Sequence, residues 1–307
     1  MKQVKIGSRP VSAIVQGCMR LESLSVKEIR NLIDLHLDAG VNFWDHADIY
    51  GEEDGACETL FGEALRGMPG IREKLILQSK CGIRSQGFTI YDFSKEHIIH
   101  SVESSLQRLG TDHLDYLLLH RPDLLTQPEE VAEAFEKLKA QGKVLHFGVS
   151  NHTPGQIEVL KTAVNIPIEV NQLQFSLAHT LLLDASTHLN TNDSLAVSRD
   201  ADVLNYCRLN HVTIQCYSPF QYGAFEGPFL GNPRYEKLNS VLKKLALKYG
   251  TTENGIAAAW ILRHPAEMQV VIGTTNAQRI LGILQAADIT LTREEWYELY
   301  AAEHRLP

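Results

Sequence analysis

The chain has 307 residues, of which 44% are hydrophobic and 21% charged, and its formal net charge is −8. This composition is typical of a folded globular protein. The negative charge opposes broad binding to nucleic acid or to an anionic membrane, because both require a positive field. An odd number of cysteines without a CxxC pair predicts free thiols in a reducing cytosol. Neither a signal-peptide pattern nor a long apolar run occurs, so we expect a cytoplasmic protein without membrane spans.

Eight short apolar runs alternate with longer stretches of helical period. Each run ends in Gly, Pro or polar residues, as strands buried on both faces do. The expected strands cover residues 14–19, 42–47, 75–82, 114–122, 144–151, 167–176, 213–220 and 269–275.

Helix signals fill the intervals between these runs. Ser25 and Glu28 form a capping-box pattern, and Thr153 followed by Pro154 is a typical helix start. Residues 181–196 and 221–231 are expected to be long loops. The expected helices cover 25–39, 55–66, 94–109, 128–141, a segment from 154, 198–209, 233–249, 252–264 and 276–287.

Alternating strands and helices predict a parallel sheet, because parallel neighbours need crossover connections. No GxGxxG follows the first strand and no Pro/Gly/Ser-rich linker divides the chain. At this length we therefore predict an α/β fold, a (β/α)8 TIM barrel, with residues 1–307 forming a single domain.

Polar side chains gather at the carboxyl ends of the predicted strands, where barrels of this class place their reactive groups. Asp45 ends one strand and Tyr50 follows it, while Lys80 and His120 end the next two. A buried ammonium group is costly unless it is paired. We therefore expect Lys80 to pair with Asp45 on the neighbouring strand.

These residue types suit the reduction of a carbonyl group, which needs hydride at carbon and a proton at oxygen. Tyr50 can donate the proton, although the usual tyrosine pKa of about 10 is high for this task. Lys80 is expected to lower that pKa, and Asp45 to hold Lys80. His120 can orient the carbonyl by a hydrogen bond.

The motifs DHADIYG, QSKCG and LLLHRPD resemble the segments that supply the catalytic Asp, Tyr, Lys and His of the aldo-keto reductase family. The resemblance runs from residue 18 to the helix near 276, and it is closest to bacterial-type NADP-dependent oxidoreductase barrels. It implies reduction of an aldehyde or ketone, with Asp45, Tyr50, Lys80 and His120 as the catalytic residues. Two departures concern the pocket wall: His46 replaces the usual Thr or Ser, and Cys81-Gly82 lacks the aromatic of some members.

The same resemblance implies a nicotinamide site. Ser150, Asn151 and Gln172 would bind the carboxamide, for which paired donors and acceptors are required. Tyr217, in the motif Tyr217-Ser218, would stack on the ring.

A phosphate site is expected where the last strand meets a helix. Gly273, Thr274 and Thr275 offer small side chains and free amides next to a helix N-terminus. Arg279 lies in the first turn, where the helix dipole disfavours a cation unless an anion is bound. By resemblance Arg279 contacts the 2′-phosphate of NADPH, so NADPH is expected rather than NADH. Gly273 and Ile283 stand where many members have Lys and Asn.

Two other functions are considered. A metal-dependent hydrolase or isomerase barrel would draw ligands from Asp45, His46, Asp48, His120 and Asp123, but Lys80 would add a positive charge among them. A non-catalytic, NADPH-binding regulatory barrel is the other. We expect no metal and a small carbonyl substrate. The physiological substrate, the direction of the reaction in the cell and the oligomeric state are left open.

Several histidines and tryptophans are expected to have a structural and not a catalytic role. His36, His97 and His100 are expected at solvent-facing or boundary positions, and Trp260 and Trp296 between helices. Strand alternation turns Trp44 away from the face of Asp45, towards the helices.

Overall fold

The computed structural model of the protein describes residues 1–223, 226–304 and 306–307. Eight strands form a closed barrel in the order β10-β11-β12-β3-β4-β5-β8-β9. Each lies within one of the eight predicted runs, so the predicted α/β barrel is confirmed. The barrel strands are β3 (Ile14–Gly17), β4 (Phe43–Asp45), β5 (Ile76–Cys81), β8 (Leu114–Leu119), β9 (Val144–Ser150), β10 (Ile168–Gln174), β11 (Thr213–Tyr217) and β12 (Gln269–Ile272).

The chain divides into two compact units. One comprises residues 15–172, and the other residues 1–14 and 173–307. The single domain over 1–307 stays a prediction.

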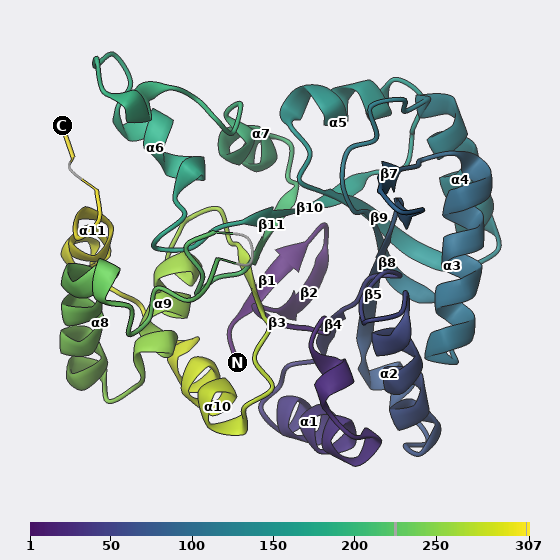
Figure 1. The fold of residues 1–307 in the computed structure, drawn as a ribbon, viewed down its shortest axis with the longest axis horizontal. Coiled ribbons are helices and arrows are strands. Elements are labelled where there is room, and N and C mark those ends of the chain that lie inside the picture. Colours follow the sequence, from purple (N-terminus) through teal and green to yellow (C-terminus); the bar gives the residue numbers. More distant parts are fainter. Residues whose placement is uncertain (224–225, 305) are drawn as a thin grey trace. The chain divides into compact units, whose positions relative to one another are not determined.

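In the unit of residues 15–172, five helices lie outside the parallel strands β4, β5, β8 and β9 (Figure 1). The predicted capping box forms at the first helix: the Ser25 hydroxyl accepts from Glu28 N–H, and the Glu28 carboxylate accepts from Ser25 N–H. Thr153 and Gln156 make the same pair. The helices are α1 (Val26–Asp38), α2 (Ala56–Arg66), α3 (Lys95–Leu109), α4 (Pro128–Ala140) and α5 (Pro154–Lys161), with short 3-10 turns η1 (Leu21–Ser23) and η2 (Arg72–Lys74).

The register of β4 against β5 sets the geometry of the site. Asp45 lies directly opposite Gln78. Beyond the strand end the ladder continues, since His46 N–H donates to Gln78 O and Asp48 N–H donates to Lys80 O. The loop towards Tyr50 is therefore fixed by backbone bonds to β5.

The unit of residues 1–14 and 173–307 contains an N-terminal hairpin and most of the later helices. Its helices α8 and α11 lie side by side at the left of Figure 1. The further elements are β1 (Gln3–Ile6), β2 (Arg9–Ser12), α6 (Leu181–Thr187), η3 (Ser194–Ala196), α7 (Val203–Leu209), η4 (Pro233–Tyr235), α8 (Glu236–Tyr249), α9 (Glu253–Leu262), α10 (Ala277–Ala286) and α11 (Arg293–Ala301).

Several sequence-based assignments were wrong. Residues 181–196, expected to be a loop, include helix α6, whose Leu182 and Leu183 are buried. The helix expected over 198–209 begins only at Val203, because Ala201 and Asp202 adopt left-handed backbone conformations. The hairpins β1–β2 and β6 (Ile83–Ser85) with β7 (Thr89–Tyr91), and helix α11, were not predicted. In the predicted loop 221–231, residues 224 and 225 lie outside the described residues.

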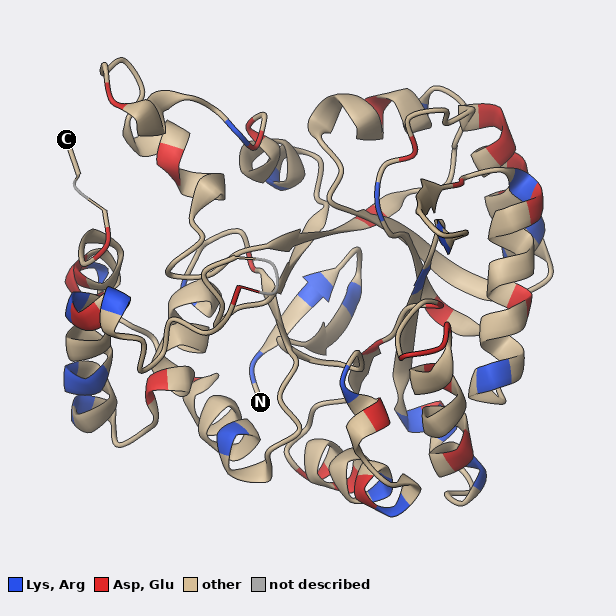
Figure 2. Ribbon diagram, in the orientation of Figure 1, with Lys and Arg blue, Asp and Glu red and all other residues tan. Residues whose placement is uncertain are grey.

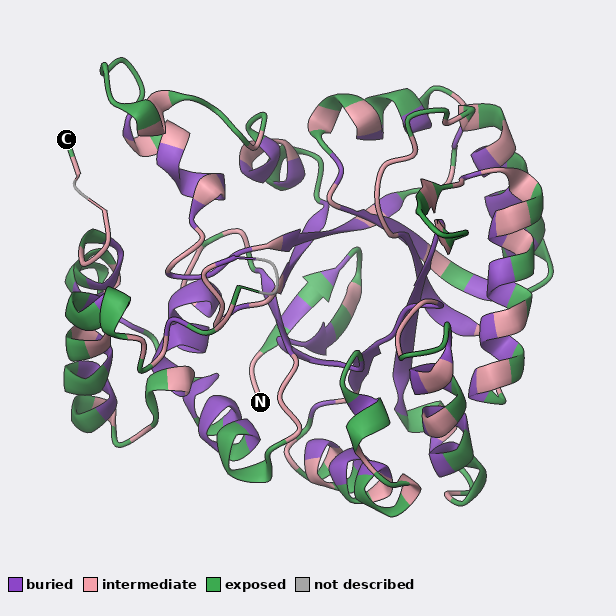
Figure 3. Ribbon diagram, in the orientation of Figure 1, coloured by how far each residue is buried: buried purple, intermediate pink, exposed green. Residues whose placement is uncertain are grey.

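Burial follows the alternation of strands and helices: strands are mostly buried, and helices are buried on one side (Figure 3). Lys, Arg, Asp and Glu lie mainly on helices and loops (Figure 2).

Trp44 packs against Phe61 and His36, with ring centroids 5.0 and 5.2 Å away, so its predicted direction towards the helices is confirmed. His36 is fully buried, so the predicted solvent-facing or boundary position was wrong. None of the helices in the described ranges is long and apolar enough to cross a membrane.

Candidate active site

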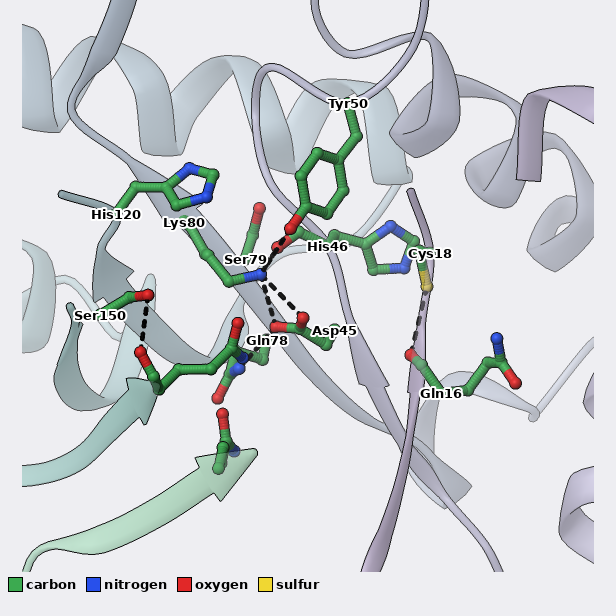
Figure 4. Close-up of polar contacts among 12 residues, drawn as sticks. Gln16, Cys18, Asp45, His46, Tyr50, Gln78, Ser79, Lys80, His120 and Ser150 are labelled. Atoms are coloured by element: carbon green, nitrogen blue, oxygen red, sulfur yellow. Dashed lines mark hydrogen bonds and ion pairs between the residues drawn. The ribbon is translucent and has the colours of Figure 1, made fainter. Parts of the chain in front are cut away.

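The four predicted catalytic residues lie together at the carboxyl ends of β4, β5 and β8 (Figure 4). The Lys80 ammonium lies 2.8 Å from the Asp45 carboxylate, as expected, and 3.1 Å from Tyr50 Oη. It also donates to the backbone oxygen of His46 at 2.9 Å. Lys80 has no solvent exposure, so these contacts replace its hydration.

The three contacts of Lys80 match the three N–H donors of its ammonium group. An ammonium group carries three donors and no acceptor, and Lys80 reaches three acceptor groups. Tyr50 Oη accepts from Lys80, so the phenolic proton is directed away from the lysine. That proton remains available to another acceptor.

Burial dominates the pKa values at this site. It raises the pKa of Tyr50 above its usual value; Lys80 opposes this and Asp45 adds to it. The expected net lowering by Lys80 is therefore not found, although Lys80 does act in that direction. Burial alone would lower the pKa of Lys80, but Asp45 and Tyr50 outweigh burial and raise it. The site thus holds a charged lysine beside a protonated tyrosine.

His120 stands edge-on to Tyr50, with ring centroids 5.9 Å apart. Burial, with Lys80 and Arg121, holds the pKa of His120 well below its usual value. The ring is therefore neutral near pH 7 and carries one N–H donor. No described residue bonds its Nδ1. A neutral imidazole can donate a hydrogen bond to a carbonyl oxygen without taking its proton.

Two contributors to this site were missed from the sequence. The side-chain amide of Gln78 donates to Asp45 Oδ1 at 2.6 Å. Its place two residues before Lys80, on the same face of the strand, was a usable signal. The backbone oxygen of His46 is the second contributor. No sequence pattern indicates that this oxygen accepts a hydrogen bond from Lys80.

Three predicted carboxamide ligands lie side by side where β9 and β10 end. Ser150 Oγ donates to the backbone oxygen of Gln172 at 2.9 Å, and Asn151 Nδ2 donates to Ser150 Oγ at 2.9 Å. Asn151 adopts φ 59°, a left-handed conformation that Asn tolerates better than most residues. Strain of this kind is often found at functional sites.

The remaining predicted cofactor ligands belong to the unit of residues 1–14 and 173–307. Tyr217 ends β11, and Ser218 follows with φ 50°, an unusual conformation for serine. Gly273, Thr274 and Thr275 join β12 to α10, which Asn276 caps by accepting from Arg279 N–H. Arg279 is exposed in the first turn of α10, as predicted, and forms no ion pair with another described residue.

A polar cleft of about 540 Å³ runs along α3 and reaches Ile49, the neighbour of Tyr50 in the chain. Asp48, one of the residues that line it, is 8% exposed, and burial together with Glu58 raises the pKa of Asp48 to about 7. The cleft is lined by Asp48, Ile49, Asp54, Ile83, Arg84, Ser85, Gln86, Asp92, Ser94, Glu96, His97, His100, Ser101, Ser104 and Arg108.

Two of the residues considered as metal ligands make other contacts. Asp45 binds Lys80, and Asp123 accepts from the backbone N–H groups of Phe93 and Leu125. Over the ranges described, no group of three or more His, Cys, Asp or Glu side chains is arranged to hold a metal ion.

Comparison with known proteins identifies the family. Residues 13–303 match the model of the "Aldo/keto reductase family". The chain is 35% identical over 301 residues to "Oxidoreductase YdhF" of Escherichia coli, covering 95% of this chain and 93% of that protein. It is 34% identical over 301 residues to a "6-dehydroglucose reductase" of Agrobacterium fabrum, with coverages of 94% and 93%.

Two further matches bear on cofactor and fold. "Aldo-keto reductase yakc [NADP(+)]" of Schizosaccharomyces pombe is 28% identical over 302 residues, with coverages of 89% and 83%. The crystal structure of the thermostable aldo-keto reductase Tm1743 superposes with a TM-score of 0.77 at 24% identity, covering 98% of this chain and 100% of that one. The chain belongs to the aldo-keto reductase family and is an oxidoreductase. Membership of this family argues against the alternative function of a metal-dependent hydrolase or isomerase.

Proposed function

We propose that the protein reduces an aldehyde or ketone to an alcohol with NADPH, using Tyr50 as the general acid. The observation that carries this proposal is the hydrogen-bond chain from Asp45 through the buried Lys80 to Tyr50 Oη. Because Lys80 donates to Tyr50, the phenolic proton is free to pass to a substrate oxygen.

The cofactor, when bound, supplies the hydride. His120 donates a hydrogen bond to the carbonyl oxygen and orients it. Tyr50 transfers its proton to that oxygen, and Lys80 stabilises the phenolate that is left. Positioned proton transfer of this kind is worth roughly 10²- to 10⁴-fold in rate. Asp45 keeps Lys80 in place and charged.

The residues at the ends of β9 and β10 fit a carboxamide. Ser150, Asn151 and Gln172 together offer hydroxyl and amide groups that can both donate and accept. We assign these three residues to the nicotinamide amide, Tyr217 with Ser218 to the ring, and Gly273, Thr274, Thr275 and Arg279 to the phosphates.

Replacing Tyr50 tests the catalytic proposal. Tyr50→Phe removes only the hydroxyl, so turnover with NADPH should fall by at least about 10²-fold. NADPH affinity, followed by quenching of tryptophan fluorescence, should change by less than about twofold, which is under 0.5 kcal/mol. Tyr297→Phe, on the exposed side of α11, is the matched control.

Each outcome is informative. Substantial turnover by Tyr50→Phe would contradict the role of Tyr50. If the unmodified protein binds NADPH tightly but reduces no aldehyde or ketone in a broad panel, the protein is better explained as a non-catalytic, NADPH-binding regulatory barrel than as a reductase.

Replacing Arg279 tests the choice of cofactor. Arg279→Ala should weaken NADPH binding by about tenfold or more, about 1.4 kcal/mol, because a charge-assisted contact to the 2′-phosphate is lost. NADH lacks that phosphate, so its affinity should change little. Equal losses for both cofactors in parallel titrations would refute the contact. Arg293→Ala, in the first turn of α11, controls for the loss of a cation at a helix start.

For the substrate we propose a polyhydroxylated aldehyde. A relative covering nearly the whole chain is named as a 6-dehydroglucose reductase. The cleft beside Ile49 offers charged and hydroxyl groups, and Ile49 and Ile83 are the only aliphatic side chains among the described residues that line it. Such a lining suits a sugar chain better than an alkyl one. In the same panel, 6-dehydroglucose should therefore have a higher kcat/KM than an aliphatic aldehyde of equal length, and the reverse order would contradict this assignment.

A further inference from the structure

Gln78 is a buried amide in direct contact with the carboxylate that holds Lys80. Its Nε2 lies 2.6 Å from Asp45 Oδ1, and the two residues are 0% and 2% exposed. They face each other across the β4–β5 ladder, and Figure 4 shows the Gln78 side chain directed at Asp45. Gln78 therefore contacts Asp45 on one side while Lys80 binds it on the other.

The contact matters because Asp45 acts on both Lys80 and Tyr50. The carboxylate stabilises the charged lysine and disfavours the tyrosinate. A donor to a carboxylate stabilises its charge and offsets part of the field that it exerts on neighbours. Asp45, Gln78 and Lys80 are all nearly or fully buried, so these effects are stronger there than in water.

We propose that Gln78 is a positioning residue of the reductase site: its amide fixes the Asp45 carboxylate, offsets part of its charge and so sets how readily Tyr50 releases its proton. The inference rests on the proposed function of this site. Gln78 acts through Asp45 and need not contact the substrate.

The sign of the effect follows from the charges. Without the amide, more of the negative field of Asp45 reaches Tyr50, and the phenolate becomes less stable. Tyr50 then becomes a weaker acid for carbonyl reduction. In the reverse reaction, in which Tyr50 must first lose its proton, the acidic limb of the pH–rate profile moves to higher pH.

Gln78→Met is the test variant, because methionine keeps the length of the side chain and removes the donor. Its kcat for reduction should fall by about tenfold, and the acidic limb of alcohol oxidation should move up by about one pH unit, which is the same free energy. KM and NADPH affinity should stay within about twofold, under 0.5 kcal/mol.

Two further variants separate positioning from packing. Gln78→Glu can donate to Asp45 only while its carboxyl group is protonated, so its activity should approach that of the unmodified protein at low pH and fall as pH rises. Gln215→Met removes another fully buried glutamine amide, one bonded to Gln269 at 2.9 Å, and should leave the pH profile in place.

The inference is overturned if Gln78→Met changes thermal stability but leaves both pH profiles where they were. It is also overturned if Gln215→Met shifts them equally. Failure of the reductase proposal is recognised separately, because Tyr50 ionisation can be followed without turnover. The difference between the ultraviolet titrations of a variant and of the same variant carrying Tyr50→Phe reports Tyr50 alone. At a fixed alkaline pH where both proteins stay folded by circular dichroism, less tyrosinate in Gln78→Met supports the inference even if no carbonyl is reduced.

Discussion

At the scale of single residues, Lys80 shows how a buried charge is kept. Taking an ammonium group out of water costs several kcal/mol unless close partners replace the lost hydration. Lys80 has a carboxylate, a backbone oxygen and a phenol as partners, all within 3.1 Å. The arrangement that stabilises the charge is the same one that directs the proton of Tyr50 away from the lysine.

His46 is the opposite case. It is fully buried, and no described residue bonds either ring nitrogen. Burial, with the charge of Lys80, lowers the pKa of His46 to about 3, so the ring is neutral. Its aromatic face contacts Phe61, with ring centroids 4.6 Å apart. An unpaired buried N–H costs free energy that an apolar residue would avoid.

We therefore expect His46→Leu to raise the free energy of unfolding by about 1–2 kcal/mol, the cost of an unsatisfied buried donor. Lys80 should keep its partner, because it bonds the backbone oxygen of His46 and not the ring. Urea denaturation at pH 7 measures the change. His36→Leu is the control: the His36 ring bonds Leu32 O at 2.9 Å, so its loss should not stabilise. Destabilisation by His46→Leu would show that the ring contributes packing that leucine cannot reproduce.

At the scale of elements, helix α11 contacts both α9 and α6 through aromatic side chains. The indoles of Trp260 on α9 and Trp296 on α11 stack at 5.0 Å, and each indole N–H donates to the backbone oxygen of the other residue. The predicted packing of these two tryptophans between helices is therefore confirmed. Tyr300, also on α11, bonds Asp184 on α6.

Glu295 joins α11 to α8. Its carboxylate accepts from Lys248, from the Tyr249 hydroxyl and from Thr292 N–H in a capping box. Burial opposes its ionisation, but these donors outweigh burial and lower the pKa of Glu295 to about 2. A folded-state pKa below the usual 4.5 contributes stability that is complete above pH 4.5 and is lost as the pH falls towards 2.

Glu295→Gln should lower the free energy of unfolding at pH 7 by about 1–3 kcal/mol, the range for hydrogen bonds to charged groups. The difference from the unmodified protein should shrink as the pH falls below 4.5, where the carboxylate of the unfolded chain becomes protonated. Denaturation curves at several pH values test both statements. Glu298→Gln on the same helix is the control, since its pair with Lys244 is exposed and contributes little. A pH-independent difference would show that the charge of Glu295 is not the cause.

At the scale of the whole molecule, the barrel explains why distant sequence segments share one site. The parallel ladders from β4 to β9 bring the carboxyl ends of consecutive strands together, and Asp45, Lys80 and His120 each stand at such an end. A short, mostly apolar run that ends in polar residues is a local pattern, so the strands and the four catalytic candidates were predictable from the sequence.

Local patterns were insufficient where an element depends on distant contacts. Helix α6 lacks a side-chain cap and is held by buried leucines and by Tyr300 of α11, more than a hundred residues away. The three-residue strands of the β6–β7 hairpin are too short and too exposed to show a hydrophobic period. His36 lies on a helix face that the sequence pattern left ambiguous, and packing against Trp44 decides its burial.

The sequence by itself determined the strand order along the chain, the capping of the main helices and the residue types available for proton transfer, because these depend on near neighbours and on side-chain chemistry. Only the tertiary structure decided that burial outweighs Lys80 in setting the pKa of Tyr50, that the backbone of His46 completes the lysine's contacts and that Gln78 faces Asp45. Desolvation and hydrogen-bond partners are properties of the packed interior, and they come from strands that are far apart in the chain.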